Sequence, residues 1–133
     1  MILLVSALLA NQSIAANYYV RVTGSGANAG SSPASAWRTI QHAADTLSSG
    51  DTVYVGAGSY VEKVRITSGG GTSSNPTKYI ADTDGSNTGD AGVVRVSYTS
   101  GGTYDDVVRV DGPDYFTGDR RRYRCQQRHE PGP

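Results

Sequence analysis

The loop Asp82–Asp90 is the stretch whose side chains could most readily bind a metal ion. It holds three aspartates among Asn, Ser, Thr and Gly, and calcium in proteins takes carboxylate and amide oxygens as ligands. The spacing is not that of an EF-hand, because Gly85 comes too early and Val93 stands where that motif has Glu. The same residue types are common in ordinary turns. We therefore expect a turn, keep calcium as the alternative, and assign no metal ligand.

A second acidic set could in principle provide acid and base groups for hydrolysis of a glycosidic bond. Its members are Asp105, Asp106, Asp111 and Asp114. Asp106 can share a strand face with Val108 and Val110, but Asp111-Gly112-Pro113-Asp114 has the composition of a turn. Solvated turn aspartates explain the set more simply than a catalytic pair, so we assign no catalytic residue.

Aromatic side chains offer a third kind of chemistry, the stacking of rings on sugars. The tyrosines expected at the surface are Tyr54, Tyr60, Tyr98 and Tyr104. They could form a glycan-binding strip, although the high strand propensity of tyrosine explains them equally well. Trp37 could stack on a sugar too, but its place on an apolar face favours core packing.

The histidines and the cysteine do not suggest a metal or redox site. We expect His42 to be solvent-exposed, with no second His or Cys nearby to complete a zinc site. Cys125 is the single cysteine, so no disulfide can form within the chain. Cys125 and His129 both lie in an arginine-rich tail.

One predicted helix stands among short extended segments. Trp37, Ile40, Ala44 and Leu47 recur at helical spacing, so we predict a helix Trp37–Leu47 that begins after Ser35 and ends before Gly50. The predicted strands are Tyr18–Thr23, Thr52–Val55, Val61–Ile66, Thr77–Ala81, Val93–Tyr98 and Asp106–Val110, with corners at Gly56–Ser59 and Ser68–Asn75. Alternation places these side chains on the inner faces: Tyr18, Val20, Val22, Val53, Val55, Val64 and Ile66.

This order of elements favours a β-solenoid over an antiparallel sandwich. Strands and turn-rich corners recur after the helix, and a solenoid needs a cap over the core of its first layer. A layer takes roughly 20 residues or more, so residues 52–117 supply about three layers. The small sandwich stays open as an alternative, since it has the same short strands.

Composition and charge fit a turn-rich β protein better than a nucleic-acid-binding protein. The chain has 133 residues, with 17 Gly, nine Tyr and only 18% charged residues. Its formal charge of zero averages two unlike regions: residues 120–133 hold five Arg and one Glu, a charge of +4, which leaves −4 for the rest. An acidic body does not attract phosphate backbones.

The N-terminal residues 1–16 have the pattern of a secretory signal. An apolar run, Ile2–Ala10, is followed by polar residues and by Ala15-Ala16, so we expect cleavage after Ala15 or Ala16. No Lys or Arg precedes the apolar run, which suggests that the true start lies upstream. The run is too short to cross a bilayer.

An ordered set of motifs resembles a known family. It comprises Tyr18-Tyr19-Val20, Gly24–Gly30, Trp37–Ala44, Gly50–Val55, Gly58-Ser59-Tyr60 and Val108–Thr117. Together they resemble the opening of secreted right-handed parallel β-helix proteins, the pectin-lyase-like superfamily. The resemblance covers about Tyr18–Thr117 and implies that fold. It also implies an extracellular role on polysaccharide, either by lyases that use calcium and a Lys or Arg base or by hydrolases, although the family also includes adhesins.

The sequence thus predicts an all-β chain in three parts: a signal peptide at 1–16, the N-terminal part of a right-handed parallel β-helix at 17–119, and a basic tail at 120–133. The abrupt change of composition near Gly118 suggests that the tail is disordered or comes from a shifted reading frame. We expect the intact protein to bind or degrade extracellular polysaccharide, with this fragment inactive. The alternatives are a non-catalytic surface protein of adhesin type or a small β-sandwich binding module. Oligomeric state is left open, and neither nucleic-acid binding nor a membrane span is expected.

Overall fold

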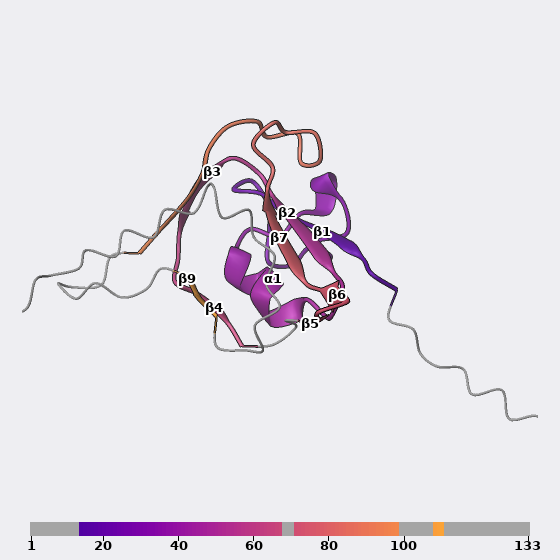
Figure 1. Cartoon of the computed structure of the whole chain (residues 1–133). Helices are drawn as coiled ribbons and strands as arrows, with labels where there is room; N and C mark the ends of the chain where they lie inside the picture. Colours follow the sequence, from indigo (N-terminus) through magenta and orange to yellow (C-terminus); the bar gives the residue numbers. More distant parts are fainter. Residues whose placement is uncertain (1–13, 68–70, 99–107, 111–133) are drawn as a thin grey trace, which may run out of the picture.

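Short parallel strands and one helix form the core of the chain. The structure, a computed structural model, describes residues 14–67, 71–98 and 108–110 (Figure 1). The helical segments are η1 (Pro33–Ser35) and α1 (Ile40–Thr46). The strands are β1 (Asn17–Val20), β2 (Thr52–Val55), β3 (Gly58–Val61), β4 (Val64–Ile66), β5 (Gly71–Thr72), β6 (Asn75–Pro76), β7 (Lys78–Ala81), β8 (Val94–Ser97) and β9 (Val108–Val110). The expectation of a strand-rich chain with one early α-helix is confirmed.

Two successive runs of three strands pair with each other in the same order. Strand β7 pairs with β2, β8 with β3, and β9 with β4, and all three pairings are parallel. Strand β1 lies on the other side of β2, again parallel, which gives the three-stranded sheet β1-β2-β7. The small hairpin of β5 and β6, which overlaps the predicted corner 68–75 and extends to Pro76, is antiparallel. Parallel neighbours cannot be joined by a tight turn. The strands β2, β3 and β4 therefore meet their partners only after the chain has passed through other strands, and β1 meets β2 only after η1 and α1.

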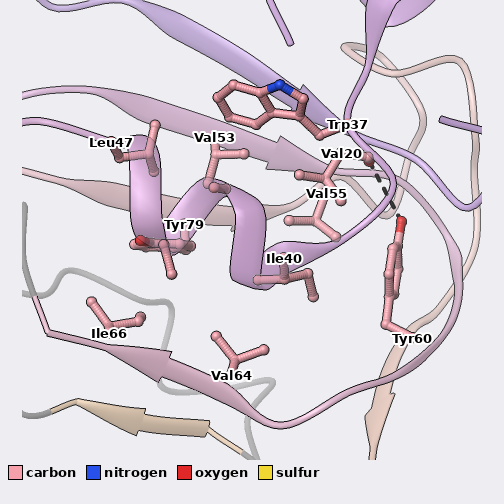
Figure 2. Close-up of a cluster of buried hydrophobic side chains, with 12 residues drawn as sticks. Val20, Trp37, Ile40, Leu47, Val53, Val55, Tyr60, Val64, Ile66 and Tyr79 are labelled. Carbon is pink, nitrogen blue, oxygen red and sulfur yellow. Dashed lines mark hydrogen bonds between the residues drawn. The ribbon is translucent and has the colours of Figure 1, made fainter. Parts of the chain in front are cut away.

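The inner faces of these strands meet in one apolar core. Twelve buried side chains from β1, α1, β2, β3, β4, β7 and the intervening loops form a single cluster, most of which Figure 2 shows. The predicted inner residues Val20, Val53, Val55, Val64 and Ile66 are all buried, as expected. Tyr18 and Val22 are partly buried and pack against the same cluster.

The predicted helix Trp37–Leu47 is too long at both ends. Helix α1 begins at Ile40, and its N-cap is Thr39, whose hydroxyl accepts a hydrogen bond from the His42 N–H at 3.2 Å; Ser35 instead ends η1. Trp37 is in extended backbone because it pairs with β1: its N–H donates to the Tyr19 carbonyl, and its carbonyl accepts from the Arg21 N–H, both at 2.9 Å.

Core packing of Trp37 is confirmed, and it replaces the helical position that we predicted. The side chain is buried, the indole Nε1–H donates to the Asn28 carbonyl at 2.8 Å, and the Tyr18 ring stacks on it at 4.9 Å between centroids. Gly30, at φ +73°, leaves room for this indole, because a Cβ there would lie 2.3 Å from Trp37 Cε2.

The predicted strand Val61–Ile66 is broken into β3 and β4. Residues 62 and 63 form a corner between them, and β3 begins earlier than expected, at Gly58. Gly58 can begin the strand at φ +144° because it has no Cβ, which would lie 2.5 Å from Val22 Cγ1. Within β3, Tyr60 faces inward and is buried, whereas its neighbours Ser59 and Val61 are exposed.

Hydrogen bonds from side chains connect α1 with β4 and with the corner at residues 62–63. The Gln41 amide donates to the Arg65 carbonyl at 3.1 Å and accepts from the Arg65 N–H at 2.7 Å, as a neighbouring strand would. In return, the Glu62 carboxylate accepts hydrogen bonds from the N–H groups of Ile40 and Gln41 at 2.9 and 2.8 Å. These are two of the amides that a helix start leaves without an intrahelical partner. Glu62 therefore caps a helix 22 residues before it.

We predict that Glu62→Ala lowers the free energy of unfolding by about 1–2 kcal/mol, because it leaves two helix N–H groups without their acceptor. Denaturant titration followed by far-UV circular dichroism measures the change. Ser59→Ala, at an exposed position of β3, is the matched control and should shift stability by less than about 0.5 kcal/mol. Equal stability of the two variants would contradict the capping role.

Candidate functional site

The outer face of the sheet β1-β2-β7 carries two parallel rows of side chains. Side chains alternate along each strand. Val20, Val53 and Tyr79 point into the core, and the residues next to them on the same strand point outward. Because the three strands are in register, the outward residues line up across them. One row is Tyr19, Tyr54 and Ile80; the other is Asn17, Thr52 and Lys78.

The first row, which we call the aromatic row, presents a stacked pair of rings. The centroids of Tyr19 and Tyr54 lie 5.9 Å apart with 28° between the ring planes. Both side chains are half-buried, and Ile80 beside them is 38% exposed. Tyrosine combines a broad apolar face with a hydroxyl that can hydrogen-bond. Such a surface suits a ligand with one apolar face and many hydroxyls, which is the description of a sugar ring.

The second row supplies polar groups next to these rings. Asn17 and Lys78 are exposed and Thr52 is half-buried. Residues two apart on a strand are about 7 Å from each other, so the polar row runs beside the aromatic row at roughly the width of one sugar ring. An amide, a hydroxyl and an ammonium offer both donors and acceptors. The two rows together are the candidate site.

The predicted tyrosine strip is only partly right. Tyr54 does face outward, in the aromatic row. Tyr60 does not: it is buried, and its hydroxyl donates to the Gly56 carbonyl at 2.8 Å. Tyr98 is 44% exposed but lies beside Lys63, whose Nζ is 5.9 Å from the ring centroid. Tyr104 lies outside the described residues. Tyr19 was not among the predicted surface tyrosines. Strand alternation could have identified it, because its neighbours Tyr18 and Val20 were both predicted to face inward.

The loop 82–90 is built around a buried carboxylate. Asp82 Oδ2 accepts hydrogen bonds from the Thr88 N–H and hydroxyl at 2.6 and 2.7 Å and from the Asn87 N–H at 3.0 Å, while Oδ1 faces the Asn87 amide at 3.3 Å. Burial alone would raise the pKa of Asp82, but these hydrogen bonds outweigh it and lower the pKa to about 2. The turn that we expected is thus present, and the Asp82 carboxylate at its centre accepts hydrogen bonds from protein donors.

Asp90, the last residue of that loop, binds Arg21, the residue that follows β1. The Arg21 guanidinium binds the Asp90 carboxylate through two hydrogen bonds of 2.7 Å and donates a third, at 3.2 Å, to the Pro33 carbonyl. The hydrogen bonds from Arg21 lower the pKa of Asp90. Gly56 lies beneath the pair, since a Cβ there would lie 3.0 Å from Asp90 Oδ2. The ion pair links residues 69 apart in sequence.

Every carboxylate in the described part of the chain accepts a hydrogen bond from the protein. Backbone amides donate to Asp51, Glu62 and Asp82, and Arg21 donates to Asp90. The exposed carboxylates of Asp45 and Asp84 accept hydrogen bonds from the side chains of Gln41 and Ser86. Within residues 14–67 and 71–98, no group of three or more His, Cys, Asp and Glu side chains could hold a metal ion. The acidic set Asp105, Asp106, Asp111 and Asp114 lies outside the described residues, as do Cys125 and the tail 120–133.

His42 is half-buried rather than fully exposed. Its ring lies 4.9 Å from the Trp37 ring at 40°. His42 lies in the first turn of α1. His129 lies outside the described residues.

Comparisons with protein-family models, with curated proteins and with solved structures each gave no match. Within the described residues, no helix has both the length and the apolar character needed to span a bilayer. The case for a function therefore rests on the chain's own residues.

We predict that Asp82→Asn lowers the free energy of unfolding by about 2 kcal/mol at pH 6. The folded pKa of Asp82 lies below its ordinary value of 3.8, so its stabilisation is present above about pH 4 and is lost as the pH falls towards 2. The deficit of the variant should shrink over the same interval. Urea titrations from pH 6 to 2 measure it. Asp84→Asn, exposed in the same loop, is the control. A pH-independent deficit would contradict this assignment.

Proposed function

We propose that this chain is the N-terminal part of an exported, right-handed parallel β-helix protein that binds extracellular polysaccharide. The architectural part is supported by the pairing of β2, β3 and β4 with β7, β8 and β9 in the same order and all parallel. A crossover between parallel strands of one sheet is right-handed in nearly all proteins. Parallel pairing also argues against the alternative of an antiparallel sandwich module.

The aromatic row carries the binding part of the proposal. Tyr19 and Tyr54 stack side by side at 5.9 Å, Ile80 extends the apolar surface, and Asn17, Thr52 and Lys78 run beside it. A sugar ring that lies on a tyrosine face buries its C–H surface there, while its hydroxyls reach the polar row. Because the row crosses three strands, it suits a chain of sugars better than a single one.

Binding without cleavage is the role that we propose for the described part. Its carboxylates cap a helix, close a loop and form an ion pair. A general base must instead lie within reach of the proton that it abstracts from the substrate. The intact parent can still be a polysaccharide lyase, a hydrolase or a non-catalytic surface protein. Those choices depend on residues outside this site.

We predict that Tyr54→Ala weakens polysaccharide binding about fivefold, since one stacking contact contributes on the order of 1 kcal/mol. Affinity electrophoresis of the full chain, in gels that contain neutral or uronate polysaccharides, measures the retardation. Tyr54→Phe keeps the ring and should bind nearly as well as the unchanged chain. Tyr98→Ala removes an exposed tyrosine elsewhere and is the matched control. If no polysaccharide retards the unchanged chain, or if Tyr98→Ala has the larger effect, the proposal fails.

A further inference from the structure

The buried carboxylate of Asp51 lies beside the chain's entry into the fold. Asp51 comes just before β2 and is 4% exposed. Its Oδ1 accepts a hydrogen bond from the Ala16 N–H at 2.9 Å, and its Oδ2 accepts one from the Ser48 N–H at 2.8 Å. Both donors are neutral amides while the leader is attached. A buried carboxylate is costly unless it is well paired, so a positive charge on the Ala16 nitrogen would improve the site.

Ala16 is held on both sides of its peptide unit. Its carbonyl accepts a hydrogen bond from the Thr52 N–H at 2.9 Å, in addition to the bond from its own N–H to Asp51. Ala16 is half-buried, whereas Ala15 is exposed and the Ile14 side chain is 88% exposed. The contacts of the fold therefore include Ala16, while the two residues before it extend into solvent.

The sequence around Ala16 separates the two predicted cleavage points. Signal cleavage sites have small residues in an Ala-x-Ala-like arrangement, one and three positions before the cut. A cut after Ala15 places Ala15 and Ser13 there, and both are small. A cut after Ala16 places Ala16 and the bulky Ile14 there.

We propose that the leader is removed between Ala15 and Ala16 and that the new α-ammonium of Ala16 forms an ion pair with Asp51. The inference rests on the export part of the proposed function and is independent of polysaccharide binding. Signal peptidase hydrolyses the Ala15–Ala16 peptide bond: water gives its hydroxyl to the Ala15 carbonyl carbon and a proton to the Ala16 nitrogen, which takes up a second proton at neutral pH. The nitrogen that already faces Asp51 at 2.9 Å thereby becomes a cation.

A cut one residue later would have the opposite effect. Loss of Ala16 would take away the donor to Asp51 Oδ1 and the acceptor of the Thr52 N–H. Two contacts that hold the start of β2 would be lost, and the buried carboxylate would have one partner fewer. The fold therefore favours the same bond as the sequence pattern.

Intact-mass analysis of the exported protein tests the cleavage point. The chain is expressed in a bacterial host with two lysines inserted after Met1, which place positive charge ahead of the apolar run Ile2–Ala10, and residues 2–133 are unchanged. We expect the exported chain to begin at Ala16. A start at Asn17 or at any other residue overturns the proposal, and a chain that keeps its leader overturns both this proposal and export. Failure to bind polysaccharide would leave a start at Ala16 unaffected.

Stability measurements test the ion pair. The chain 16–133 should have a folding equilibrium constant about tenfold higher than the chain 15–133, because a charge-assisted hydrogen bond is roughly twice as strong as a neutral one. Acetylation of the Ala16 nitrogen should abolish the advantage, and so should Asp51→Asn in both chains. Equal stability of the two unmodified chains, or an advantage that persists after acetylation, overturns the ion pair. Acetylation keeps the test valid if Asp51→Asn does not fold.

Discussion

Parallel, in-register pairing between strands far apart in the chain is the constraint from which the rest of the structure follows. When Val53 pairs with Tyr18 and Tyr79, inward residues fall beside inward ones and outward residues beside outward ones. The same register therefore produces both the shared core of Figure 2 and the stacked Tyr19 and Tyr54 on the outside. A shift of one residue in any strand would exchange the two faces.

The first edge of the sheets needs protection, since an exposed strand edge invites pairing with another chain. Three devices provide it. The extended backbone at Trp37 pairs with β1, the Gln41 amide pairs with Arg65 in β4, and Glu62 fixes the start of the helix that carries Gln41. Carboxylates also hold the chain together elsewhere: Asp82 accepts hydrogen bonds from within its own loop, and Asp90 binds Arg21, which lies 69 residues earlier in the chain.

Local patterns in the sequence predicted what depends on local alternation. Strand β2 was predicted with its observed bounds, and the inner residues Val53, Val55, Val64 and Ile66 followed from period-two spacing. Contacts between distant residues were not predictable in this way. The Trp37 indole fits a helical face in sequence, but its backbone pairs with β1. Glu62 had no evident role in the sequence, but in the fold its carboxylate accepts a hydrogen bond from the first turn of α1. Tyr60 was expected outside because nothing in the sequence indicated that β3 begins at Gly58.

The candidate site shows the same division. Tyr54 was predicted from its strand, but its partner Tyr19 lies 35 residues earlier and joins it only through the register of β1 and β2. That register is best tested by nuclear Overhauser effects in the uniformly labelled protein. Parallel stacking predicts backbone contacts of Tyr19 with Tyr54, of Tyr54 with Ile80 and of Tyr60 with Val96. Contacts that instead run in opposite directions along the paired strands would contradict the account.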